Sequence, residues 1–257
     1  MTGWFEGKSI LVTGAASGIG ASAARRFAAE GASVCLADRD GEGARRVAGL
    51  IEAEGGRAIS IAADIAVEDD NRAMVRAAVD AFGGLDNAFL NAGYFSPTPP
   101  FGEDGIDAFD RIIAINLRGT YLGLRSVFDA IRPGGAVVVT ASAAGLRGLP
   151  DAPAYSASKH GLVGLVTSVA PAFSEKQCRI NVICPGGVNT PMSGVPHSDA
   201  VVAPGDLRTV PCQGYLDAQH VAEMALFLAS TRAGGLTGTA YAVDGGLTAT
   251  LVSRPPD

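Results

Sequence analysis

Short apolar runs alternate with longer amphipathic stretches along almost the whole chain. The short runs show little polar alternation, which is typical of strands buried on both faces, and the longer stretches have helical periodicity. The predicted strands are Ser9–Thr13, Ser33–Ala37, Ala58–Ala62, Asn87–Asn91, Ala136–Ala141, Arg179–Cys184 and Thr239–Val243. The predicted helices are Ile19–Glu30, Glu42–Glu54, Glu68–Phe82, Asp104–Ile131, Ala154–Ser174 and Asp217–Ala229. Strands separated by helices predict a doubly wound α/β fold, with a seven-stranded parallel sheet covered on both faces, in a single domain over residues 1–257.

Two stretches depart from this alternation. Residues 186–214 contain several prolines and glycines without a clear period, and a loop of that length is usually functional or mobile. We predict that it forms a lid over a substrate. Pro171 falls inside the predicted helix 154–174, where its missing N–H should kink or shorten the helix.

Composition narrows the classes of function. The net charge of −6 disfavours a nucleic-acid partner. The chain shows no signal peptide and no apolar run long enough to span a bilayer, which predicts a protein without a membrane partner. The four cysteines lack C-x-x-C spacing and the three histidines are far apart in sequence, so neither zinc nor a disulfide framework is expected, and a reducing cytoplasm fits best.

The first strand is followed by T-G-A-A-S-G-I-G, with glycines at Gly14, Gly18 and Gly20. Residues without a Cβ allow unusual backbone angles and a close approach to a pyrophosphate at the N-terminus of the next helix. The spacing G-x-x-x-G-x-G is a variant of the usual dinucleotide signal, and the strand before and helix after it strengthen the prediction.

Asp38 ends the second strand, 18 residues after Gly20, where an acidic residue holds the adenosine ribose hydroxyls in dinucleotide folds. A carboxylate there repels a 2′-phosphate, and the neutral Ser17 supplies no compensating cation. We therefore expect NAD rather than NADP as the cofactor. Arg39 leaves an alternative open, because its guanidinium could accept a phosphate or could be an ordinary solvated charge.

Tyr155 and Lys159 lie four residues apart, so a helix would place both side chains on one face. A cation held beside a tyrosine lowers the pKa of the phenol, and this makes a general base. The alternative is that the two are ordinary surface neighbours.

Together these motifs resemble those of the short-chain dehydrogenase/reductase family, from about Lys8 to Gly246. The glycine motif, the acidic residue Asp64, the triplet Asn91-Ala92-Gly93 and the pair Pro185-Gly186 stand in the family's order and spacing. The resemblance implies a Rossmann-type fold and a catalytic tetrad of Asn116, Ser142, Tyr155 and Lys159. The cofactor-binding residues expected from the motifs and the resemblance are Gly14, Ser17, Gly18, Ile19, Gly20, Asp38, Arg39, Asp64, Ile65, Asn91, Ala92, Gly93, Tyr155, Lys159, Pro185, Gly186, Val188 and Thr190.

The family's chemistry implies a role for each member of the tetrad. Tyr155 would be the acid or base for the substrate hydroxyl, and Lys159 would lower its pKa and bond the nicotinamide ribose. Ser142 would donate a hydrogen bond to the substrate oxygen, and Asn116 would hold a water that links Lys159 to solvent. Thr190 and the Val188 amide would bind the nicotinamide carboxamide.

The chain departs from the family pattern at two positions that leave the tetrad intact. Leu90 stands where a second Asn commonly precedes N-A-G, and Ala141 replaces the first of two serines that end the fifth strand.

The expected activity is the NAD(H)-dependent interconversion of a secondary alcohol and a ketone. The segments Tyr94–Phe101, Ser142–Asp151 and Gly187–Tyr215 are expected to form the walls of the substrate pocket. The last of them is mostly apolar, with Val188, Met192, Val195, Leu207 and Tyr215, which favours an uncharged, hydrophobic or cyclic substrate. Arg147 and Arg208 are the charged exceptions. The alternatives are an NADPH-dependent 3-oxoacyl-[carrier protein] reductase, which Asp38 disfavours, and a non-catalytic dinucleotide sensor. The resemblance also implies a homotetramer.

Overall fold

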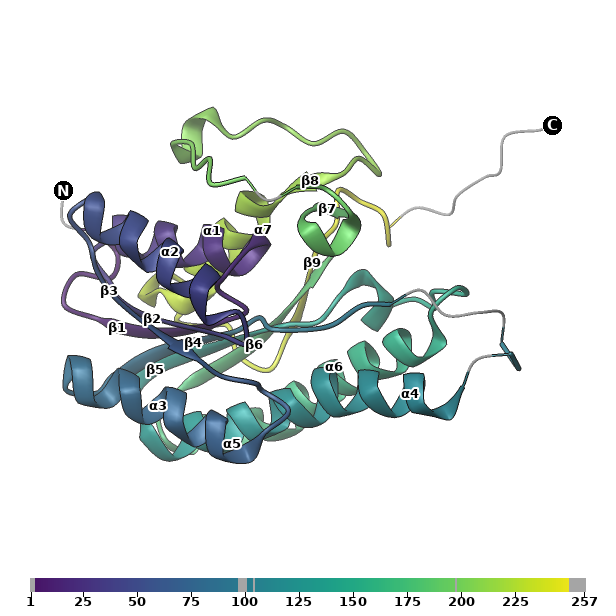
Figure 1. Ribbon diagram of the computed structural model, residues 1–257, viewed down its shortest axis with the longest axis horizontal. Coiled ribbons are helices and arrows are strands. Elements are labelled where there is room, and N and C mark those ends of the chain that lie inside the picture. The colour runs from purple at the N-terminus through teal and green to yellow at the C-terminus, as the bar shows by residue number, and fades with distance from the viewer. Residues whose placement is uncertain (1–2, 97–100, 104, 197, 250–257) are drawn as a thin grey trace.

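The computed structural model describes residues 3–96, 101–103, 105–196 and 198–249. Its main feature is a seven-stranded sheet in the order β3-β2-β1-β4-β5-β6-β9, in which every neighbouring pair is parallel (Figure 1). The strands are β1 (Ser9–Thr13), β2 (Ser33–Asp38), β3 (Arg57–Ala62), β4 (Leu85–Leu90), β5 (Ile131–Thr140), β6 (Arg179–Pro185) and β9 (Ala240–Val243). The predicted parallel sheet is confirmed.

Helices cover both faces of the sheet (Figure 1). They are α1 (Gly18–Ala29), α2 (Gly41–Ala53), α3 (Glu68–Phe82), α4 (Ile106–Ile112), α5 (Thr120–Ala130), α6 (Pro153–Glu175) and α7 (Ala218–Ala229). Alternate residues of β1 enter opposite cores, because Ile10 and Val12 pack with α1, α2 and α7 whereas Leu11 packs with α3, α5 and α6. Burial on both faces explains why the strands show no polar alternation.

The strand order reverses direction between β1 and β4, which are neighbours in the sheet although β2 and β3 lie between them in sequence. At such a switch point the loops that leave the carboxyl ends of two neighbouring strands diverge to opposite faces and open a crevice, the usual binding place in open α/β sheets. The loops after β1 and β4 carry the predicted glycine motif and the Asn91-Ala92-Gly93 triplet. The fold therefore brings these two motifs together at the carboxyl ends of β1 and β4.

The helix predicted over 104–131 is helical without a break from Ile106 to Ala130, but it is not uniform. Residues Ile113–Gly119, between α4 and α5, form a π-helical segment, and Ile131 is already the first residue of β5. Asp104 lies outside the described residues. Pro171 does not shorten α6, which continues to Glu175.

The segment 186–214 has more order than its sequence suggests. A short strand β7 (Val188–Asn189) pairs in parallel with β8 (Leu216–Asp217), and 3₁₀ turns form at Pro191–Ser193 and Pro204–Asp206. In Figure 1 the chain between β7 and β8 extends over the side of the sheet that carries α1 and α2. His197 lies outside the described residues.

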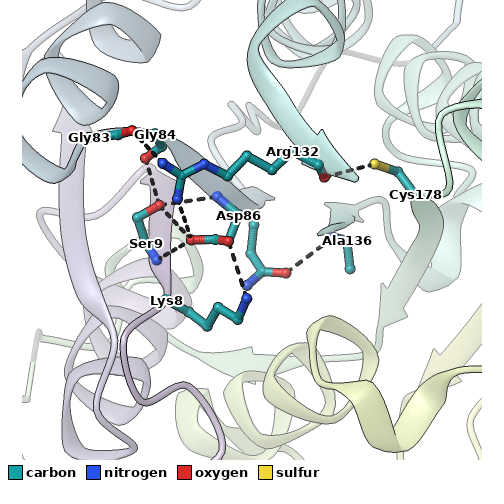
Figure 2. Close-up of polar contacts among 9 residues, drawn as sticks. Lys8, Ser9, Gly83, Gly84, Asp86, Arg132, Ala136 and Cys178 are labelled. Carbon is teal, nitrogen blue, oxygen red and sulfur yellow. Dashed lines mark hydrogen bonds and ion pairs between the residues drawn. The ribbon is translucent and has the colours of Figure 1, made fainter. Parts of the chain in front are cut away.

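The amino ends of the strands carry a polar cluster around Asp86 (Figure 2). The Asp86 carboxylate accepts hydrogen bonds from the Ser9 backbone N–H at 2.9 Å and the Ser9 hydroxyl at 3.1 Å. Lys8 Nζ lies 3.3 Å and Arg132 Nη1 3.6 Å from its two oxygens. These contacts join the starts of β1, β4 and β5 at the edge opposite the predicted site.

Within the described ranges, no helix is both long and apolar enough to cross a membrane. The same residues contain no group of three or more His, Cys, Asp or Glu side chains placed to share a metal ion.

Candidate active site

The glycine motif forms a tight cradle between β1 and α1. Gly14 has φ 68° and Gly18 has φ 54°, a region that favours glycine. A Cβ on Gly14 would lie 2.9 Å from the Cα of Ala92, and one on Gly20 would lie 2.0 Å from the Gly14 carbonyl oxygen. The loop after β4 therefore packs directly against the glycine loop.

The N-terminus of α1 opens from this cradle. Ser17 is its N-cap residue, but no side chain caps the helix and the first turn holds no acidic residue. Ile19, in that turn, packs against the core. The N-terminus of a helix carries a partial positive charge, as an anionic pyrophosphate requires.

Thr13, a residue to which the sequence assigned no role of its own, ties the cradle to the sheet. Its hydroxyl accepts hydrogen bonds from the backbone N–H groups of Asn91 at 3.0 Å and Ala92 at 3.1 Å. Thr140 donates to Asn91 Oδ1 at 3.1 Å from β5. Three neighbouring strand ends are thus fixed together.

Asp38 lies beside the glycine loop at the end of β2. Its carboxylate accepts the backbone N–H of Ala16 at 3.0 Å and that of Asp40 at 2.9 Å. The carboxylate therefore lies against the loop expected to hold the pyrophosphate. Arg39 is exposed.

Asp64 and Ile65 follow β3 in a turn that continues this edge. Asp64 is exposed and accepts the backbone N–H of Ala66 at 2.9 Å. The Ile65 carbonyl accepts from the Asn71 side chain at 2.7 Å and would lie 2.9 Å from a Cβ on Gly119. The π-helical segment therefore packs closely on the turn that carries two of the expected cofactor-binding residues.

Tyr155, Ser142 and Lys159 come together where α6 crosses the end of β5. Ser142 hydrogen-bonds to Tyr155 and its hydroxyl also accepts the Ala144 N–H at 3.1 Å. Lys159 is 3% exposed, its Nζ lies 5.5 Å from the centroid of the Tyr155 ring and it donates to the Thr140 carbonyl at 3.0 Å.

Asn116 completes the group from the π-helical segment, where it is fully buried. Its side chain accepts from the Tyr94 N–H at 2.7 Å and donates to the Tyr94 carbonyl at 2.9 Å. A Cβ on Gly93 would lie 3.4 Å from both Asn116 Oδ1 and Lys159 Nζ. All four residues of the expected tetrad are therefore gathered beside the N-A-G loop.

The pKa of Tyr155 is raised in this structure, opposite to the direction expected from its lysine neighbour. Burial is the largest cause, and the hydrogen bond with Ser142 lowers the pKa only in part. Burial also lowers the pKa of Lys159 to about 8. Desolvation is the main cause of both shifts. Lys159 lies over the face of the Tyr155 ring and donates to Thr140.

Phe95 contacts the tyrosine directly. Its ring meets that of Tyr155 edge to face, with centroids 5.1 Å apart and planes at 83°. The guanidinium of Arg111 covers the neighbouring Tyr94 ring at 4.8 Å. The sequence predicted this segment as a pocket wall but gave no signal for the Phe95 contact, because 60 residues separate the two rings. Residues 97–100 of the predicted wall lie outside the described residues.

The segment 186–214, which we call the strap, follows β6 and passes over the cradle. Val188 is held in β7 against β8, and Thr190 caps the following 3₁₀ turn with Ser193. A Cβ on Gly18 would lie 3.1 Å from Cγ2 of Thr190. The expected carboxamide-binding residues therefore lie close to the glycine loop.

Pro185 ends β6, and the next turn packs against a buried acid that the sequence did not single out. A Cβ on Gly186 would lie 2.9 Å from the Cα of Asp244. Burial raises the pKa of Asp244, but hydrogen bonds from Thr248 and Gly246 outweigh this effect and leave the pKa below its usual value. Asp244 thus fixes the chain after β9 beside the strap.

Known proteins share both the sequence and the fold. Residues 14–248 match a family model described as enoyl-(acyl carrier protein) reductase. A 2,5-dichloro-2,5-cyclohexadiene-1,4-diol dehydrogenase of Sphingobium indicum is 37% identical over 248 residues, covering 95% of this chain and 98% of that protein. A cyclohexanol dehydrogenase of Acinetobacter sp. is 36% identical over 250 residues, covering 96% and 98%.

Solved structures agree with this result. The crystal structure of levodione reductase has a TM-score of 0.86 at 34% identity, covering 96% of this chain and 100% of that chain. A short chain dehydrogenase from Mycobacterium paratuberculosis bound to NAD has a TM-score of 0.87 at 29% identity, covering 96% and 100%. One from Burkholderia cenocepacia in complex with NADP has a TM-score of 0.84 at 32% identity, covering 94% and 98%.

The family model spans most of the chain, and the relatives align along nearly all of it with the same fold. The chain therefore belongs to the short-chain dehydrogenase/reductase family.

Proposed function

We propose that this protein is an NAD(H)-dependent oxidoreductase that interconverts an uncharged, hydrophobic or cyclic secondary alcohol and the corresponding ketone. The observation that carries the proposal is the assembly of Tyr155, Ser142, Lys159 and Asn116 around the N-A-G loop, next to a glycine cradle. A fold alone does not assign chemistry, whereas this group supplies an acid or base, an oxyanion donor and a buried cation.

The cradle fits a dinucleotide. A side chain at Gly14 or Gly20 would fill the space beside the loop, and α1 begins directly after the loop at Gly18. The residues that would hold the cofactor run from this turn through Asp38 and the N-A-G loop to Lys159 and Thr190. When bound, the nicotinamide would supply the hydride acceptor or donor at its C4 position.

The protein's own groups would handle the proton. Tyr155, as phenolate, would take the hydroxyl proton of the alcohol while the carbinol carbon gives up its hydride, and in reverse it would protonate the ketone oxygen. Ser142 would donate a hydrogen bond to the same oxygen as its charge develops. Lys159 would favour the phenolate. The positive charge of the oxidised nicotinamide would also lower the pKa of Tyr155, which burial raises.

The preference for NAD is argued from the charge at the end of β2. Asp38 lies against the glycine loop through its bond to Ala16, and its carboxylate would accept ribose hydroxyls and repel a 2′-phosphate. Solved relatives are bound to NAD in one case and to NADP in another, so the argument depends on this chain's own residues.

The substrate class is argued from the pocket wall and from the relatives. Phe95 lies edge to face on Tyr155 and offers an apolar surface at the reacting oxygen. The relatives are named for a cyclohexadiene diol and for cyclohexanol. A ring bearing a secondary hydroxyl is the chemistry that unites these observations.

The test is an absorbance assay for reduced nicotinamide. Purified protein would be incubated with NAD⁺ or NADP⁺ and with matched cyclic, linear and carboxylate-bearing secondary alcohols. We expect turnover with NAD⁺ and with uncharged cyclic alcohols ahead of the charged ones. Binding of NAD⁺ without turnover of any alcohol or ketone would indicate a dinucleotide sensor instead.

A further inference from the structure

The segment between β7 and β8 is fastened to α1 and α2 by an acid. Asp199 accepts two hydrogen bonds from Nη1 of Arg46, at 2.7 Å and 2.6 Å to its two carboxylate oxygens. The Asp199 carbonyl accepts a further hydrogen bond from Arg25 of α1, which also pairs with Glu54 after α2. This strap therefore connects to both helices through one residue.

Arg46 reaches from α2 to the glycine loop. Its Nη2 donates to the carbonyl of Ala16 at 3.3 Å, while the N–H of the same residue is bound by Asp38. The Arg46 guanidinium and the Asp38 carboxylate thus both bind the backbone of Ala16 in the glycine loop. Arg46 is the cation placed beside the position where the proposed function puts the adenosine ribose.

The partner of Arg46 decides what that cation can bind. A guanidinium is well suited to a phosphate, because its N–H donors match two phosphate oxygens. In this structure Nη1 is committed to both oxygens of Asp199. The strap thus brings a negative charge to an arginine of α2 that also contacts the glycine loop at Ala16.

We propose that Asp199 competes with a 2′-phosphate for Arg46, and that the strap thereby contributes to the choice of NAD over NADP. The inference rests on the proposed function, since it assumes a dinucleotide on the glycine loop. Asp38 repels the phosphate directly, whereas Asp199 acts by occupying the cation that would attract it. Asp38 at the end of β2 and Asp199 on the strap would then both contribute to the choice between NAD and NADP.

The pair can be broken without disturbing the fold. The side chains of Arg46 and Asp199 are 43% and 44% exposed, and exposed pairs of this kind contribute little to stability. Asp199→Asn removes the charge at nearly constant size. Asp206→Asn is the matched control, because it removes the same charge from an exposed position of the same strap.

The test measures binding of two nucleotides by calorimetry: adenosine 2′,5′-bisphosphate and adenosine 5′-monophosphate, which differ only in the 2′-phosphate. We expect Asp199→Asn to lower the Kd of the bisphosphate by about threefold to tenfold and to leave the Kd of the monophosphate unchanged. Asp206→Asn should change neither value. Adding Arg46→Gln to Asp199→Asn should abolish the gain.

Three results would overturn the inference and leave the proposed function standing. An equal change in both Kd values would show that the strap controls only the access of nucleotides to the site. Tighter bisphosphate binding that persists without Arg46 would assign the effect to another cation. A gain of equal size in Asp206→Asn would indicate a general effect of net charge. If neither nucleotide nor NAD binds to the wild-type protein, the proposed function itself fails, and this inference fails with it.

Discussion

At the scale of single residues, the candidate site places two ionisable groups in an environment that opposes their charge. Burial raises the pKa of Tyr155 and lowers that of Lys159 to about 8, so both are driven toward neutral forms. Such perturbed groups gather at functional sites because chemistry requires pKa values different from those in water. The hydrogen bond from Ser142 moves the tyrosine back toward ionisation.

We expect Tyr155→Phe to lower kcat by about 10²–10⁴-fold, the usual contribution of a general acid or base. The ring and its contact with Phe95 are kept, so NAD binding should change little. Steady-state kinetics and a fluorescence titration with NADH would check both. A variant that keeps near wild-type kcat would contradict the role assigned to Tyr155.

The pKa of Lys159 predicts a pH dependence of stability. Its folded value of about 8 is below the ordinary 10.5, so between these values the unfolded chain holds a proton that the folded chain has released. The unfolding free energy due to this group therefore rises with pH across the window, by about 3 kcal/mol in total. Below pH 8 the burial of the charged amine weakens the fold.

The measurement compares wild type with Lys159→Met by urea unfolding from pH 7 to pH 10. Thiols of the unfolded chain also titrate in this range, and the difference between the two proteins removes this shared contribution. We expect wild type to gain stability relative to the variant as pH rises. A difference that stays flat with pH would show that Lys159 keeps its ordinary pKa.

At the scale of elements, α6 carries the proposed catalytic residues Tyr155 and Lys159 in its first turns and a proline near its end. Pro171 is exposed and inside the helix, where it lacks a backbone donor and its ring crowds the preceding turn. The helix nevertheless continues to Glu175, because its apolar face packs through Leu162, Val166 and Phe173 into the core. Tertiary packing overrides local propensity here.

Replacing this proline should stabilise the protein. We expect Pro171→Ala to raise the unfolding free energy by about 1–2 kcal/mol, since the helix regains a hydrogen bond while the unfolded chain regains some freedom. Ser174→Ala, at an exposed position of the same helix, is the control and should add no more than about 0.5 kcal/mol. Thermal and urea unfolding would check both, and a destabilised Pro171→Ala would indicate that the proline has a packing role of its own.

The loop cradle depends on one hydroxyl. Thr13 is buried and accepts from two backbone N–H groups, so Thr13→Val would leave both donors without that acceptor. We expect a loss of about 1–3 kcal/mol in unfolding free energy, together with weaker NAD binding. Thr13→Ser keeps the hydroxyl and should restore most of both properties; equal effects of Val and Ser would assign the loss to packing.

At the scale of the whole molecule, the carboxyl ends and the amino ends of the strands have different roles. The carboxyl ends of the strands hold the candidate site, whereas the amino ends are joined by the Asp86 cluster (Figure 2). Asp86 is 7% exposed and binds both Ser9 donors between two cations. A buried carboxylate satisfied in this way stabilises three strands at once but does not touch the chemistry.

We therefore expect Asp86→Ala to reduce the unfolding free energy by about 2–4 kcal/mol, because it leaves a buried N–H without its acceptor. Lys8→Ala should cost less than about 1 kcal/mol, since Lys8 is half exposed. The folded Asp86→Ala protein should keep the wild-type kcat. A large fall in kcat of the fully folded variant would show that the Asp86 cluster and the candidate site are coupled.

The sequence by itself determined the elements and their class. Seven apolar runs and the helical periods between them dictate a parallel sheet with two covered faces, because each strand must bury both sides. Glycines at a βα turn and a Tyr/Lys pair at helical spacing are also local signals, and they predicted the cradle and the centre of the site. Spacing along one element suffices for such features.

The tertiary structure decided what depends on distant residues meeting. The π-helical turn at Asn116 exists where its side chain binds Tyr94 across the crevice, and no local pattern encodes that bond. The contact of Phe95 with Tyr155 and the raised pKa of the tyrosine follow from burial, which periodicity does not measure. The pairing of Asp199 with Arg46 joins residues 153 positions apart, and only the folded chain brings a charge on the strap to a cation beside the glycine loop.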